Sequence, residues 1–174
     1  MVKRVAISRE LDDTDRRILA LVQKDASLAQ AEIGKRVGLS TAAVHERVKK
    51  LEAAGVIRRW VAVVDPAAVG AQVCAYVEVF FEHPKFEKGF LEGVKKLDAV
   101  QECHHITGEF SLLLKVRVAD MPSLQALLLE KLSGHEGVRQ TRTVMVLSTV
   151  KEESYVETMG PTGLAMARGR GEDA

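Results

Sequence analysis

The chain has few cysteines and none of the long apolar runs that mark several large classes of protein. Its 174 residues include two cysteines, Cys74 and Cys103, and no Cys-X-X-Cys pair. Nothing here implies a required disulfide, and each cysteine falls within a strand pattern, so we expect buried thiols rather than a redox or metal site. No apolar run approaches the ~18 residues of a membrane span, and the first residues lack the apolar stretch of a secretory signal. We therefore expect a cytoplasmic protein with no membrane partner.

Two short amphipathic patterns meet at a Gly-Leu-Ser break within QAEIGKRVGLSTAAVHERVKKLEAAGVIRRWVAVV, residues 30–64. Ile33 and Val37 share one face of the first pattern, and Gly38 follows where a helix end needs a left-handed residue. Ser40 then supplies an N-cap oxygen for the second helix. Two helices joined by such a turn predict a helix-turn-helix. The apolar stripe of the second helix consists of Val44, Val48 and Leu51.

The face opposite this stripe has the composition of a surface that enters the major groove of DNA. Small residues let the backbone approach base edges, hydroxyl and imidazole groups hydrogen-bond to bases or phosphates, and cations neutralise phosphates. Glu46 either accepts from a cytosine amine or offsets the neighbouring cations. Arg47 lies about 60° from the centre of the stripe, so it contacts either DNA or an acid of the first helix. The DNA-binding candidates are Ser40, Thr41, Ala42, Ala43, His45, Glu46, Arg47, Lys49, Lys50, Arg58 and Arg59.

The charge distribution agrees with a DNA-binding module joined to a second module. Residues 1–64 carry 13 Lys or Arg against 8 Asp or Glu, whereas residues 65–174 carry 12 against 16. The total net charge of +1 is therefore the sum of a basic amino-terminal part and an acidic carboxy-terminal part. The hydrophobic content of 47% provides cores for two small domains.

The segments around the helix-turn-helix complete the first domain. A preceding helix, capped by Asp12 or Asp13, packs as a third helix against the core of the helix-turn-helix. Val56–Val64 is predicted to be a strand, which makes the domain a winged or arm-extended variant. We assign residues 1–64 to this helix-turn-helix domain and its arm strand. Residues 65–71 form a hinge, in which Asp65 caps a short turn that Gly70 closes.

Residues 72–157 alternate strand and helix patterns in the order βαββαβ, and residues 158–174 lack a period and predict a flexible tail. This order is that of a ferredoxin-like fold, so the chain as a whole is α+β. Two helices cover one face of such a four-stranded antiparallel sheet, and we expect dimerisation or a ligand to bury the other. The predicted strands are 72–82, 100–107, 111–118 and 138–150, and the predicted helices are 86–97 and 122–134.

Four separated motifs occur in this order: LDDTDRRIL, IGKRVGLSTAAVHERVKKLEAAGVI, QECHHITGEFSLLLK and VRQTRTVMVLSTVKE. Together they resemble the Lrp/AsnC family, the leucine-responsive or feast/famine transcription regulators of bacteria and archaea, over about residues 11–155. The resemblance implies a dimer-forming carboxy-terminal domain, often assembled into tetramers, octamers or a hexadecamer. It also implies that this domain senses a small molecule, commonly an amino acid, at subunit interfaces.

The resemblance further implies an effector site around the turn after the second strand of the sheet. Main-chain groups at a glycine turn can bind a carboxylate, and hydroxyls or acids can fix an amine. In the family an acid and a tyrosine often follow this turn, whereas this chain has Ser111 and Leu112. Glu109 can substitute as the counter-charge, or the more apolar pocket prefers a larger hydrophobic or aromatic amino acid, a different metabolite, or no ligand at all. The implied effector residues are His104, Thr107, Gly108, Glu109, Phe110, Ser111, Thr141 and Thr143.

Two other functions have to be weighed against a regulator. Cys103, His104 and His105 suggest a metal-responsive protein, but strand alternation puts His104 on the opposite side from the other two, so we assign no metal site. Siroheme decarboxylase subunits resemble this same family in architecture, and in that alternative His83, His104, His105 and His135 of this chain would serve a tetrapyrrole. That interpretation leaves the basic helix without a purpose. We expect no catalysis and no cofactor, and the expected partners are double-stranded DNA, a small effector and further copies of the chain.

Overall fold

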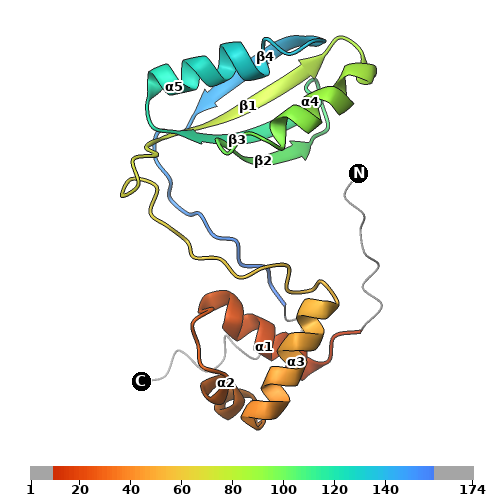
Figure 1. The fold of residues 1–174 in the computed structure, drawn as a ribbon, viewed down its shortest axis with the longest axis vertical. Coiled ribbons are helices and arrows are strands. Elements are labelled where there is room, and N and C mark those ends of the chain that lie inside the picture. Colours follow the sequence, from red (N-terminus) through yellow and green to blue (C-terminus); the bar gives the residue numbers. More distant parts are fainter. Residues whose placement is uncertain (1–9, 159–174) are drawn as a thin grey trace. The chain divides into compact units, whose positions relative to one another are not determined.

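The computed structural model describes residues 10–158, which divide into a helical unit and a sheet unit (Figure 1). Of these residues, 10–62 and 153–158 make up the helical unit, and 63–152 make up the sheet unit. Residues 153–157, which the sequence pattern assigns to the second domain, group with the helical unit in the structure. The predicted tail lies outside the described residues, apart from Thr158.

The helical unit consists of α1 (Asp13–Lys24), α2 (Gln30–Val37) and α3 (Thr41–Ala53). The caps are those that the sequence predicts: Asp12 caps α1, Ser40 caps α3, and Gly38 ends α2 with a φ of 78°. At Gly34 an added Cβ would lie 2.5 Å from the Leu39 carbonyl oxygen, so the turn between α2 and α3 requires a glycine there. The buried core joins the three helices through Ile18, Leu19, Val22, Ile33, Val37, Val44, Val48 and Leu51.

Arg47 ties α3 to the amino end of α1. Its Nη1 donates to Asp12 Oδ2 at 2.7 Å and to Asp15 Oδ1 at 2.8 Å. The Asp15 side chain is fully buried, and that of Arg47 is 28% exposed. The hydrogen bonds that Arg47 donates, to Asp12 and then to Asp15, raise the pKa of the Arg47 guanidinium. Of the two roles that the sequence left open for Arg47, the structure shows the internal ion pair. We call these three residues the Arg47 cluster.

The segment after the sheet unit lies along α1. Gln23 Nε2 donates to the Val156 carbonyl oxygen at 3.0 Å, and Val156 N donates back to Gln23 Oε1 at 2.9 Å. Arg16 and Thr158 make a second reciprocal pair, in which Arg16 Nη1 donates to the Thr158 carbonyl oxygen and Thr158 Oγ1 donates to that of Arg16. These four bonds explain why this segment belongs to the helical unit.

The strand predicted over Val56–Val64 is not formed. Within residues 10–158 the structure has no strand between α3 and the first strand of the sheet unit. Val56 and Ile57 pack against the helical core, whereas Trp60 is 43% and Val63 is 90% exposed. Alternating apolar residues suit a strand, but a strand needs a neighbour to pair with, and this chain supplies none here. The capped turn that follows is present, with Ala67 N donating to Asp65 Oδ1 and Gly70 at a φ of 77°.

The sheet unit has the predicted βαββαβ order. Its four strands are all paired antiparallel in the spatial order β2-β3-β1-β4 (Figure 1). Two predicted elements are shorter than expected. The helix predicted over 86–97 begins after a short 3₁₀ turn and ends at Val94, and the strand predicted over 138–150 ends at Met145. The elements are β1 (Val73–Phe81), η1 (Pro84–Phe86), α4 (Glu87–Val94), β2 (Val100–His105), β3 (Leu112–Val118), α5 (Met121–Ala126), the π-helical η2 (Leu127–Leu132) and β4 (Val138–Met145).

The two faces of the sheet differ in chemistry. Alternate residues of β1 and β3 are fully or almost fully buried in one core with side chains of α4, α5 and η2. The opposite face carries ion pairs: Arg142 with Glu78, and Glu152 with both Lys115 and Arg117. Arg142 lowers the pKa of Glu78, and Lys115, followed by Arg117, lowers that of Glu152. The helices thus cover the apolar face and leave a charged one.

The Arg47 cluster predicts that Arg47→Ala destabilises the helical unit by about 2 kcal/mol, because a fully buried carboxylate loses a charged hydrogen bond. Urea unfolding followed by tryptophan fluorescence measures this selectively, since the single tryptophan, Trp60, lies in the helical unit. Arg36→Ala is the matched control. Its partner is Glu32, both side chains are at least 40% exposed, and we expect a loss below about 0.5 kcal/mol. Equal losses in the two variants would contradict the role given to Arg47.

Candidate nucleic-acid interface and effector region

One face of α3 is exposed along most of its length. The core takes Val44, Val48 and Leu51, so the opposite side of the helix faces outward. The sequence-predicted DNA contacts are distributed accordingly, with Ala43 and Arg47 half-buried at the flanks. Ser40 Oγ accepts from Ala43 N at 3.2 Å, so its observed role is that of the N-cap. The exposed members of the candidate set on α3 are Thr41, Ala42, His45, Glu46, Lys49 and Lys50.

Some cations of the helical unit are held in ion pairs and others are not. Arg36 of α2 pairs with Glu32, and Arg47 pairs with two acids of the α1 region. Within residues 10–158, no ion pair engages Lys49 or Lys50. The same holds, among the described residues, for Arg58 and Arg59, which follow α3 and are exposed. Such cations can exchange counterions for phosphates without first breaking an internal contact.

His45 has a neighbour that the sequence analysis did not select. Gln30, the first residue of α2, places its Nε2 at 3.3 Å from His45 Nδ1. The two residues are 15 positions apart and belong to different helices. No local pattern links them, and the contact follows from the packing of α2 on α3.

The glycine turn that the family resemblance implies is present before β3. Gly108 has a φ of 118° and space around its Cα, and its neighbours Thr107 and Glu109 are exposed. Ile106 N donates to the Ser111 carbonyl oxygen and Ser111 N to that of Val79, which fixes both sides of the turn. Phe110 is 4% exposed, and the Arg142 guanidinium lies 4.9 Å from the centre of its ring. This turn is therefore an ordered loop with exposed main-chain groups at its tip.

The other implied effector residues do not gather on one face of the sheet. Thr141 and Thr143 pair with Val79 and Val77, and directly paired residues share a face, so both threonines lie on the helix side. Thr141 Oγ1 is 2.9 Å from Ser133 Oγ on that side. His104 pairs with Leu113 on the charged face and lies 3.2 Å from Glu102. A single protomer therefore does not bring all eight residues into one pocket.

The residues weighed for a metal or tetrapyrrole site are also dispersed. His105 contacts Glu87 of α4 at 2.8 Å, on the side opposite His104, as the alternation predicts. His135 packs edge-on against Phe90, while His83 caps η1. Burial, with a smaller effect from Glu87, raises the pKa of the Cys103 thiol, which disfavours the thiolate that binds metals. Among residues 10–158 no three His, Cys, Asp or Glu side chains form a metal-binding group.

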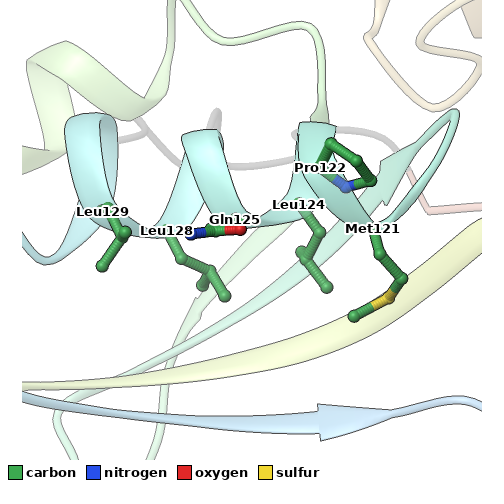
Figure 2. Close-up of a pocket in the computed structure, with 6 residues that line it drawn as sticks. All are labelled: Met121, Pro122, Leu124, Gln125, Leu128 and Leu129. Carbon is green, nitrogen blue, oxygen red and sulfur yellow. The ribbon is translucent and has the colours of Figure 1, made fainter.

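A groove of about 560 Å³ lies along α5 and η2 (Figure 2). Gln125 is the one polar side chain among the six that line it. An amino acid needs partners for both an ammonium and a carboxylate, and this lining has no charged group. None of the implied effector residues lines the groove. The lining residues are Met121, Pro122, Leu124, Gln125, Leu128 and Leu129.

No helix in the described part of the chain is long and apolar enough to cross a membrane.

Comparisons with known proteins assign both units to described domain families. Residues 11–58 match a winged helix-turn-helix DNA-binding domain, and residues 74–156 match the Lrp/AsnC ligand binding domain. The leucine-responsive regulatory proteins of Escherichia coli K12 and Klebsiella pneumoniae are each 39% identical over 148 residues. The match covers 84% of this chain and 90% of theirs.

Solved structures give the same assignment. A transcriptional regulator from Neisseria meningitidis in complex with L-Met has a TM-score of 0.80 at 30% identity, covering 84% of this chain and 96% of that one. Escherichia coli AsnC has a TM-score of 0.78 at 28% identity, covering 84% and 99%. The domain order, the βαββαβ topology and these similarities agree, and the chain belongs to the Lrp/AsnC family of transcriptional regulators, with a helix-turn-helix DNA-binding domain followed by a ligand-binding domain.

Proposed function

We propose that this protein inserts α3 into the major groove of double-stranded DNA, as a homo-oligomer, and that an amino acid bound by the sheet unit modulates this binding. The observation that carries the DNA-binding part is the exposed face of α3, with two lysines that no ion pair engages among the described residues. Paired copies of α3 would occupy successive major grooves of an approximately palindromic site.

Each part of the surface has a separate task in this proposal. Thr41, Ala42 and Ala43 stand at the amino end of α3, where small side chains and the positive end of the helix dipole favour close approach to DNA. Lys49 and Lys50 neutralise phosphates and contribute affinity without sequence preference. Arg58 and Arg59 contact the flanking backbone, and Glu46 faces the groove between His45 and the lysines.

The amino-acid part of the proposal is supported by the ligand-binding domain match and by the Neisseria relative, whose structure holds L-Met. In this chain the exposed main chain at Gly108 suits a carboxylate, and Glu109 is the acid at the turn that can meet an ammonium. Thr107 and Ser111 flank these groups, and the buried side chain of Phe110 anchors the turn to the sheet unit. Because His104 lies on one face of the sheet and Thr141 and Thr143 on the other, the proposed site includes a surface of a second subunit.

The charged sheet face fits a contact between copies of the chain. Glu78, Arg142, Lys115 and Arg117 already lie in ion pairs there, and a second copy would present the same mixture of signs. We assign no catalytic role to the chain and place it in the cytoplasm with its DNA target. The dispersed histidines support neither a tetrapyrrole enzyme nor a metal sensor.

Lys49→Ala is expected to weaken binding to specific and unrelated DNA alike, because a phosphate contact is lost. The slope of log K against log salt should fall in magnitude by about 0.9, the value for one phosphate. Fluorescence anisotropy with a labelled fragment of upstream DNA at several salt concentrations measures both quantities. Lys24→Ala, at the far end of α1, is the control and should leave the slope unchanged. Identical slopes for wild type and Lys49→Ala would remove this residue from the interface.

Glu109→Gln is expected to weaken the affinity for the effector about tenfold, because a charged hydrogen bond to the effector's ammonium group is lost. The responding amino acid is first identified by screening the twenty amino acids for a change in DNA affinity, and its affinity is then measured by calorimetry. DNA binding without effector should stay at the wild-type level. The control is Glu130→Gln, an exposed acid on η2. If both variants respond like wild type, Glu109 is not the ammonium partner.

A further inference from the structure

We propose that Gln30 of α2 is a specificity-determining residue, which positions His45 and sets the hydrogen-bonding character of the edge that His45 presents to DNA. The inference rests on the proposed function of α3. Gln30 acts through His45 and is thus a positioning residue. The observation behind it is the contact between Gln30 Nε2 and His45 Nδ1.

The fold fixes the two residues relative to each other. Gln30 is the first residue of α2 and half-buried, whereas His45 is exposed in the second turn of α3. Ile33 and Val44 of the same two helices are almost completely buried in one core, and the requirement for Gly34 at the turn brings the helices close. The contact of 3.3 Å therefore depends on rigid packing between the helices.

With the amide nitrogen of Gln30 facing the ring, the contact favours one tautomer of the neutral His45 imidazole. The amide Nε2 of glutamine is a donor, so Nδ1 accepts, and the neutral imidazole carries its hydrogen on Nε2. Nε2 lies on the ring edge away from Gln30. His45 therefore presents an N–H donor outward, and the same hydrogen bond restrains rotation of the ring.

A donor at this position discriminates among bases. In the major groove guanine offers N7 and O6, adenine offers N7, and thymine offers O4, whereas cytosine offers the N4 donor. His45 held by Gln30 should thus favour guanine, which has two acceptors, and reject cytosine. Without Gln30 the ring can rotate and exchange tautomers, so an acceptor nitrogen can also face the groove.

The test is selection of binding sites from a randomised duplex library at about pH 8.5, roughly two units above the ordinary histidine pKa. Wild type, Gln30→Ala, His45→Ala and the double variant are compared. We expect both single variants to relax the preference at the same base pair, by about five- to tenfold. The double variant should match His45→Ala alone, because Gln30 acts through His45. Gln101→Ala, an exposed glutamine in the sheet unit, is the control and should keep the wild-type preference.

Gln30→Glu gives a readout that a merely structural role would not change. A carboxylate only accepts, so Nδ1 must donate and the outward Nε2 becomes an acceptor. The preference at that base pair should then shift toward bases with a donor, cytosine N4 and adenine N6. Unfolding followed by Trp60 fluorescence should match wild type in all these variants.

The inference is overturned if Gln30→Ala keeps the wild-type preference, if its effect falls on a different base pair and adds to that of His45→Ala, or if Gln30→Glu selects the wild-type site. These outcomes leave DNA binding itself intact. Failure of the wild-type protein to bind any duplex at low salt is a different result, and it would overturn the proposed function.

Discussion

The contact of Arg47 with the carboxylates of Asp12 and Asp15 sets the orientation of the helix on which the proposed DNA contacts depend. A stripe of valines and leucine would hold α3 against the core and still tolerate small rotations about the helix axis. Two charged hydrogen bonds at 2.7 and 2.8 Å, one of them to a fully buried side chain, are directional and resist such rotation. Asp12 also caps α1, so the same group that starts the first helix orients the third.

The sequence predicts the helix-turn-helix well because its signals are local. Gly38, Ser40 and the spacing of buried residues specify the ends and faces of two helices, and the structure confirms them. The helical period also places Arg47 at the flank of α3, but it contains no information on which acid lies opposite. The contact between Gln30 and His45 was missed for the same reason, since it arises only when two helices pack.

The sheet unit shows where such prediction stops. Alternation and turn residues are sufficient for the βαββαβ order, but neither Val56–Val64 nor residues 147–150, which the sequence also predicts to be extended, are in the sheet. The effector residues came from the family resemblance. Strand register puts His104 on the face opposite Thr141 and Thr143, so a pocket that uses them needs a surface from another subunit, which one sequence does not describe.

The hydrogen bonds of α1 to Val156 and Thr158 mean that the helical unit is discontinuous in sequence. Its first segment ends near Ala62 and its second begins at Glu153, and the sheet unit is an insertion between them. A fragment that stops at residue 64 would therefore be an incomplete domain. Arg16 and Gln23 of its first helix would lose these hydrogen-bond partners, which lie 142 and 133 positions later in the chain.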